Sequence, residues 1–291
     1  SVVVPCRRHG VLQREGRAGA VAGGEPREET FRIPPGAIPG TGAVRIEIDG
    51  GLHTAIIEGV EPLIEFPYGC VEQTMSRFMP AVAAARALRG APTRWTPKLS
   101  AVVATGLRRL SDLQASNGSW AWWSDGASEA MTAYVVYGLA VCKRAGIGVD
   151  RKAADRAAAY LRERSMAASE EPPPILGGRL PLPLAVDGRV WNALALSEHE
   201  AAWGVPGLAT MRWITTLADR TGLRPVEAAM LALAAARLGM NEEAERFARQ
   251  AEARPLEDVA TASFLLQLAA LRGRAPSAAL RVATRLLARG R

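Results

Sequence analysis

The chain has 291 residues, of which 48% are hydrophobic, and its formal net charge is +7. This length and composition are ample for a core in one large domain or two. The basic residues, mostly arginines, are scattered at solvent-facing positions of predicted helices, which argues against nucleic-acid binding. No apolar run is long enough to span a membrane, so no membrane contact is expected. The residues after Ser1 do not form a positively charged segment followed by an apolar one, so no signal peptide is visible.

The three cysteines, Cys6, Cys70 and Cys142, lack the spacing of a metal site, and their odd number argues against a disulfide framework. Cys142 falls within an apolar helical pattern, which is typical of a core residue. The three histidines, at positions 9, 53 and 199, show no metal-ligand spacing either. We therefore expect no metal and no cofactor.

Residues 1–53 have the features of a β-rich segment. Val2–Val4 is a candidate short strand, and the alternation of apolar and charged residues over Val44–Asp49 predicts a half-buried strand that ends at Gly50. These strands are too few for a sheet of normal size. From residue 54 the hydrophobic period becomes helical, so we expect a second, helical domain over residues 54–291.

The most informative stretch is Phe66–Gln73, in which Cys70 and Gln73 stand three residues apart. If a helix begins near Gly69, both residues lie on one face, and the Cys70 sulfur can reach the Gln73 amide carbon. Loss of ammonia would leave an internal thioester, a stored acyl group open to attack by an amine or hydroxyl. Gly69 lets the backbone turn sharply, and Pro67 stiffens the approach. The alternative is a buried structural cysteine near a helix start, with Gln73 on the solvent face.

The residues Pro67–Gln73, followed by an apolar-periodic helix, resemble the thioester motif of the alpha-2-macroglobulin and complement family in its bacterial form. The resemblance implies a mainly α fold, an alpha/alpha toroid of helical hairpins, preceded by part of a split CUB-like β domain. It implies an endopeptidase inhibitor, not an enzyme, that becomes covalently attached to attacking proteases through their amine groups. Its other partners would be the macroglobulin-like domains of the full-length protein, in the periplasm or outside the cell.

Helical periodicity, punctuated by glycine and proline, divides the rest of the chain into about ten helices. Their expected ranges are 70–88, 98–115, 128–145, 150–168, 186–201, 207–221, 225–238, 241–253, 257–272 and 276–289. Hairpins of this length also build solenoids, so the alternative is a helical-repeat interaction module in which Cys70 is structural. The resemblance favours a ring, and because a closed toroid of this family has about twelve helices, we expect the ring to be open by about one hairpin and the return half of the β domain to be missing.

Trp120, Trp122 and Trp123 follow an Asn-Gly turn signal, in a segment that resembles the corresponding part of thioester domains. Ordinary packing of a loop over helix ends explains most of this cluster. Aromatic side chains can also keep water from a thioester, and Phe66 and Tyr68 are the other two candidates for such shielding.

His199 is the one histidine in the helical region that is a candidate base beside Cys70, and we interpret it as a solvated helix residue instead. In many complement-like proteins a downstream histidine helps the acyl group move to hydroxyls. At its usual separation in sequence from the cysteine, this histidine would lie at a residue number in the 180s, where this chain has none. We therefore expect amines as acceptors. Toroids also host terpenoid cyclases, but these need clustered aspartates, and the aspartates here are dispersed.

Overall fold

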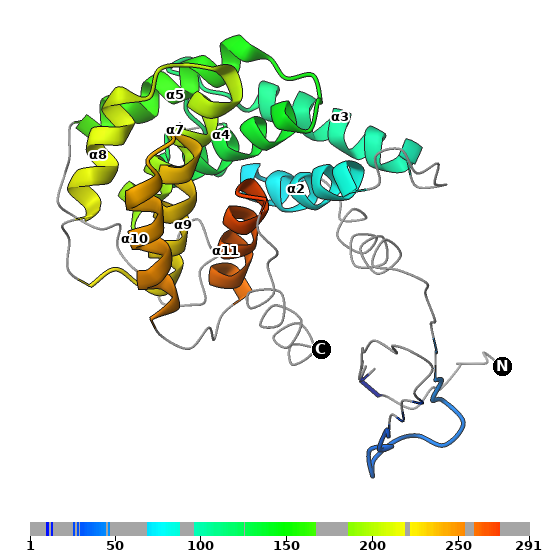
Figure 1. Ribbon diagram of the computed structural model, residues 1–291. Helices are drawn as coiled ribbons and strands as arrows, with labels where there is room; N and C mark the ends of the chain where they lie inside the picture. Colours follow the sequence, from blue (N-terminus) through cyan, green and yellow to red (C-terminus); the bar gives the residue numbers. More distant parts are fainter. Residues whose placement is uncertain are drawn as a thin grey trace.

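The computed structural model describes residues 10, 11, 13, 26, 28, 30–44, 46, 69–87, 96–124, 126–166, 186–218, 222–253 and 259–273. The regular structure in these residues is helical, apart from one isolated antiparallel β-bridge between Trp120 and Ser128. The helices follow one another along an arc of hairpins (Figure 1). No helix within these ranges is long and apolar enough to cross a membrane.

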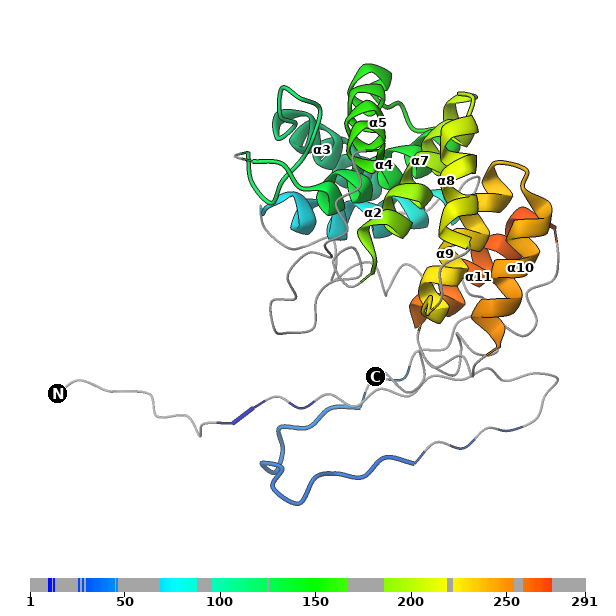
Figure 2. The ribbon, with the colours of Figure 1, turned by 90° about the vertical axis from the view of Figure 1, so that its left-hand side faces the viewer.

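The described helices alternate between an inner and an outer layer. The inner helices, each of which contacts the next, are α2 (Val71–Ala87), α4 (Glu129–Arg144), α7 (Gly188–Trp203), α9 (Pro225–Arg237) and α11 (Val259–Leu271). The outer helices, each of which packs on the inner helix before it, are α3 (Thr96–Asp112), α5 (Arg151–Met166), α8 (Leu208–Ala218) and α10 (Asn241–Glu252). Figure 2 shows the same order from the side. This alternation is the alpha/alpha toroid architecture, as the resemblance implied.

Two inner helices, α7 and α9, differ from the outer helix α10 in how they are buried. Residues 190–200 of α7 are buried without a break, and so are residues 227–235 of α9. In the outer layer, α10 buries only Ala244, Phe247, Ala248 and Ala251, which recur at helical spacing. A helix that is apolar on every side must be surrounded by protein, whereas a single apolar stripe suits a helix with one face in solvent. Burial along the sequence therefore distinguishes α7 and α9 from α10, whereas the inner helices α2 and α11 bury a single stripe as α10 does.

Polar caps and glycines set the helix ends. The Ser128 side chain accepts a hydrogen bond from the Met131 backbone N–H at the start of α4. Asp187 caps α7 in the same way, and α7 ends at Gly204, whose φ of 65° is the left-handed conformation that favours glycine. Proline at position 225 opens α9, where its missing N–H removes no helical hydrogen bond.

Three consecutive ionisable residues of α7 are buried among ion pairs. Glu198, His199 and Glu200 have 0%, 1% and 2% of their surface exposed. Their partners are Arg144 and Arg237 for Glu198, Asp155 for His199, and Arg162 and Thr210 for Glu200. These partners come from α4, α9, α5 and α8, so polar contacts join α7 to the four described helices that share the most contacts with it.

Sequence-based expectations for the helices are confirmed over the described ranges. The nine described helices match the expected ranges from 70–88 to 257–272, with ends that differ by a few residues. The expected helix over 276–289 and the strand at Val2–Val4 lie outside the described residues, as does most of Val44–Asp49. The β-rich segment, the boundary at residue 53 and the opening of the ring stay predictions.

His199 gives the protein a testable pH dependence. Burial lowers the pKa of His199, the hydrogen bond to Asp155 opposes that shift, and the positive charge of Arg162 adds to it. The folded protein therefore binds this proton more weakly than the unfolded chain does, and stability is lost as the pH falls below the ordinary histidine pKa of about 6.5. Glu200 acts in the opposite direction, because burial raises its pKa and the folded state takes up its proton more readily.

We expect His199→Gln to lose less stability than the parent protein as the pH falls from about 7 through 6.5 and below. Glutamine keeps a donor for the Asp155 carboxylate but does not titrate. Urea unfolding at a series of pH values measures this, and the difference between the two proteins cancels the contribution of Glu200. If the unfolding free energies of the parent and the variant changed in parallel with pH, His199 would titrate alike in the folded and unfolded states.

Candidate functional site

Helix α2 begins directly after the predicted reactive cysteine. The carbonyl of Cys70 accepts hydrogen bonds of 2.9 Å from the backbone N–H and from the hydroxyl of Thr74. Cys70 is therefore the N-cap residue, and Gln73 is the third residue of the helix. The expected helix start is confirmed, and both halves of the predicted thioester lie on its first turn.

The Gln73 side chain folds back over this helix start. The backbone N–H of Cys70 donates a hydrogen bond of 3.2 Å to Gln73 Oε1. This is one half of a capping box, in which the third helical residue accepts from the N-cap N–H. Cys70 is 5% exposed and Gln73 is exposed, as the alternative reading of the motif also expects. The amide nevertheless turns toward Cys70, so an incoming group can reach it while the cysteine is sheltered.

Gly69 leaves the space that the folded-back amide needs. A Cβ atom at Gly69 would lie 1.7 Å from Oε1 and 2.6 Å from Cδ of Gln73, far inside contact distance. We expected Gly69 to permit a sharp turn, but it is not among the glycines with positive φ. Its main contribution is therefore steric, because any side chain at this position would displace the amide of Gln73.

The loop that carries Trp120, Trp122 and Trp123, called the tryptophan loop below, holds the start of α2 in place. The carbonyl of Trp122 accepts a 2.9 Å hydrogen bond from the backbone N–H of Val71, one of the donors that a helix start leaves without a helical partner. The indole N–H of Trp120 donates to the carbonyl of Leu110 in α3 at 2.7 Å. The loop thus connects α3 with the first turn of α2, next to Cys70.

The aromatic residues expected to shield a thioester differ in their surroundings. Trp120 is 1% exposed and belongs to the core, as ordinary packing predicts. Trp122 and Trp123 are 39% and 58% exposed, on the part of the loop that is bonded to α2. Phe66 and Tyr68 lie outside the described residues. Shielding stays a prediction, and the position of Trp122 beside the first turn of α2 supports it.

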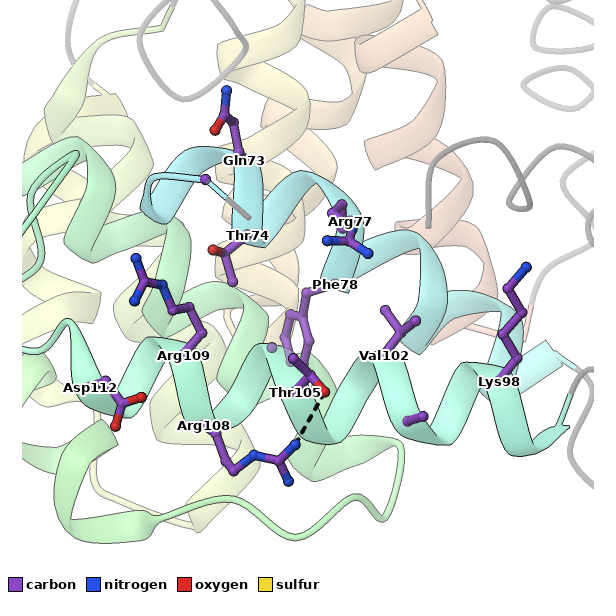
Figure 3. A pocket seen from close by; sticks show the side chains of 13 residues that line it. Gln73, Thr74, Arg77, Phe78, Lys98, Val102, Thr105, Arg108, Arg109 and Asp112 are labelled. Atoms are coloured by element: carbon purple, nitrogen blue, oxygen red, sulfur yellow. Dashed lines mark hydrogen bonds between the residues drawn. The ribbon is translucent and has the colours of Figure 1, made fainter. Parts of the chain in front are cut away.

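A groove of about 430 Å³ lies between α2 and α3 and begins at Gly69 and Gln73 (Figure 3). Sequence reasoning did not predict this groove or its charged lining. One feature of the sequence could have indicated a basic residue near the predicted thioester. Gln73 and Arg77 are four residues apart, which places both on one face of α2. The charged side chains that line the groove are Arg77, Lys98, Arg108, Arg109 and Asp112.

His199 is a buried residue, so its interpretation as a solvated one was wrong. Its ring is 1% exposed, bonds Asp155 of α5 at 2.9 Å and stacks on Trp203 with ring centroids 4.8 Å apart. Residues 190–200 of α7 are buried without a break, which is why a histidine among glutamates is buried there. Its contacts in the structure are structural and do not include Cys70 or Gln73.

Cys142 is a core residue, as its apolar helix predicts. It is fully buried, and burial raises the pKa of its thiol to about 12. Only the thiolate is a strong nucleophile, so Cys142 is inert at neutral pH. Among the residues that the structure describes, no group of three or more histidine, cysteine or carboxylate side chains is placed to hold a metal ion.

We expect Cys142 to resist alkylation by iodoacetamide at pH 8 in the folded protein and to react fully in guanidinium chloride. Peptide mapping after each treatment measures the modified fraction. Rapid native labelling of Cys142 would contradict its burial in α4 and would complicate any thiol count at Cys70.

Comparison with known families identifies this architecture. Residues 44–169, which include the first turn of α2 and the tryptophan loop, match the family model of the A-macroglobulin TED domain. This region belongs to that family. Over 141 residues, the chain is 38% identical to the alpha-2-macroglobulin of Thermotoga maritima, a match that covers 48% of this chain and 9% of the relative. The chain thus spans about a tenth of that relative's length.

Solved structures of bacterial alpha-2-macroglobulins share the fold of this TED domain. Native alpha-2-macroglobulin from Escherichia coli, from domain MG7 to the C-terminus, matches 79% of this chain and 38% of its own with a TM-score of 0.55 and 22% identity. The trypsin-activated form of the E. coli protein matches 76% of this chain and 16% of its own, with a TM-score of 0.55 and 22% identity. The Salmonella protein reacted with methylamine matches 79% of this chain and 16% of its own, with a TM-score of 0.58 and 22% identity. These likenesses confirm the alpha/alpha toroid.

Proposed function

We propose that Cys70 and Gln73 form an internal thioester, through which this TED domain attaches covalently to amine groups of proteases. The observation that carries the proposal is the 3.2 Å hydrogen bond from the Cys70 N–H to Gln73 Oε1, which holds the amide of Gln73 at the cysteine. The space left by Gly69 supports it, because the three atoms nearest to a Cβ at Gly69 all belong to Gln73.

The geometry suits formation of the bond. The Cys70 sulfur attacks Cδ of Gln73, the carbon–nitrogen bond breaks, and the departing nitrogen takes up the thiol proton and leaves as ammonia. Negative charge develops on Oε1 during the attack. The Cys70 N–H already donates to that oxygen at the positive end of α2, which is where a developing oxyanion is stabilised.

The thioester then acts as an acyl donor. The nitrogen of an acceptor amine attacks Cδ of Gln73, the carbon–sulfur bond breaks, and the amine proton passes to the Cys70 thiolate. The product is an amide on residue 73 and a free thiol on Cys70. Amines remain the expected acceptors, since the contacts of His199 lie elsewhere in the fold. Reaction of the Salmonella relative with methylamine supports this choice.

In the full-length protein, this domain would serve a bacterial alpha-2-macroglobulin-like inhibitor of proteases, in the periplasm or outside the cell. The trypsin-activated form of the E. coli relative supports protease partners, and the small share of each relative that the chain covers supports further macroglobulin-like domains as partners. Covalent trapping needs those domains as well as the thioester.

Mass spectrometry of the intact, freshly purified protein tests the proposal. We expect a mass lower than the sequence mass by one ammonia per chain. Methylamine should add to residue 73 and release one titratable thiol at Cys70. Cys70→Ala and Gln73→Ala should each abolish both effects, while Cys142→Ala should leave them unchanged.

The same experiment separates the proposal from a structural cysteine in a helical-repeat module. Full sequence mass with an unmodified Gln73 amide and a free Cys70 thiol would favour the module. A carboxylate at residue 73, found by peptide mapping, would show that the bond formed and was later hydrolysed.

A further inference from the structure

The groove between α2 and α3 combines one reactive group with a cluster of positive charge. Gln73 and Gly69 line its end at the first turn of α2, and the fully buried Phe78 is also among its lining residues. The other lining side chains include four basic groups and a single acidic one. A cavity of about 430 Å³ holds a short peptide segment or a few side chains.

Arg108 and Arg109 of α3 line the same groove as Gln73. Figure 3 shows Arg109 extending from α3 toward the first turn of α2, beside Thr74. Its Nε is buried and has no hydrogen-bond partner within the described part of the chain. Arg108 donates to the Thr105 hydroxyl at 3.2 Å, which is a neutral partner. A cation near a helix N-terminus is unfavourable by itself, so the cluster suits an anionic occupant.

We propose that this groove binds the acceptor of the thioester and selects amines that stand next to a carboxylate, such as a lysine flanked by acidic residues. The inference rests on the proposed function, and it adds the class of acceptor and the surface that chooses it. The flanking carboxylates pair with the α3 arginines, while the amine reaches Cδ of Gln73 at the end of the groove.

Two physical effects of the positive field favour such an acceptor. The field attracts carboxylates and raises their local concentration, which increases the rate of encounter. It also favours the neutral form of an amine over its ammonium form, and only the neutral amine is nucleophilic. A free ammonium ion is repelled by the same field, so a lysine without acidic neighbours gains nothing from the groove.

Two acetylated and amidated tripeptides, Glu-Lys-Glu and Gln-Lys-Gln, test the proposal on the intact chain. Both offer the same lysine amine, and only the first carries carboxylates. The measurement is the ratio of their rates of coupling to residue 73, followed by mass spectrometry at low salt. The double variant Arg108→Gln and Arg109→Gln should lower this ratio about tenfold. Arg249→Gln, on the exposed surface of α10 outside the groove, should leave it unchanged.

Salt gives an independent check, because about 1 M salt shortens the screening length to about 3 Å. The preference for Glu-Lys-Glu should largely vanish there in the parent protein. A rate ratio that is the same in the parent and the double variant would overturn the proposal, even with the thioester present.

Binding can also be measured without the thioester, which keeps the two proposals distinguishable. In Cys70→Ala, titration with Glu-Lys-Glu should shift the amide NMR signals of α2 and α3, and the added double variant should abolish the shifts. Gln-Lys-Gln should produce none. Absence of shifts with Glu-Lys-Glu would overturn the acceptor groove whatever the mass of the parent protein shows.

Discussion

Replacing Gly69 with alanine will abolish the ammonia loss at Cys70 and Gln73 and leave the domain folded. The new Cβ would lie 1.7 Å from Oε1 and 2.6 Å from both Cβ and Cδ of Gln73, so the amide must move away. Gln73 is exposed, so rotation of its side chain can relieve the contacts with Oε1 and Cδ, whereas the contact with Cβ needs a small shift of the backbone at the start of α2. We therefore expect complete loss of the thioester and a loss of about 1–3 kcal/mol in unfolding free energy, which leaves the domain folded. Intact mass and thermal melting measure the two effects.

Gly148→Ala is a matched control, because a Cβ at Gly148 has no atom within 4 Å and the backbone there does not have positive φ. It should keep the ammonia loss and the melting temperature of the parent protein. If Gly69→Ala still lacked one ammonia, the folded-back amide would not be the arrangement from which the bond forms. If Gly69→Ala unfolded the domain, the space beside Gln73 would serve the fold instead.

Local patterns were sufficient to predict the helices and the first turn of α2. Glycines and prolines mark the helix ends along the chain, as Gly204 does for α7. The proximity of Cys70 and Gln73 follows from a spacing of three residues on a helix, which needs no tertiary information. The choice of a ring over an arc is different in kind, because hairpin length is the same in both and the resemblance alone favoured the ring.

Contacts between distant residues could not be predicted in this way. The hydrogen bond from Val71 to the Trp122 carbonyl joins two backbone groups, and backbone groups leave no mark on residue identity. The run from Glu198 to Glu200 reads as a solvent-facing stretch, since three successive residues of a helix point in three directions. These residues are buried because α7 has neighbours on all those sides, each of which supplies a polar partner.

That burial leads to the largest expected loss of stability. Glu198 is fully buried and forms ion pairs with Arg144 of α4 and Arg237 of α9, whose side chains are 19% and 14% exposed. Glu198→Gln removes the negative charge that pairs with both Arg144 and Arg237, at nearly unchanged volume. Breaking a buried pair on one side costs about 3–5 kcal/mol, because the remaining charges lie uncompensated in the interior. Urea unfolding measures this difference.

A second variant separates charge from shape. Combining Glu198→Leu with Arg144→Met and Arg237→Met removes all three charges at similar volume, and replacing a buried ion cluster by apolar side chains is often neutral. We expect the triple variant to be more stable than Glu198→Gln. The exposed Glu252→Gln at the end of α10 should change the unfolding free energy by less than about 0.5 kcal/mol. If Glu198→Gln cost no more than that control, the ion pairs would not hold the inner helices together, and the apolar contacts of α7 with α4 and α9 would have to do so alone.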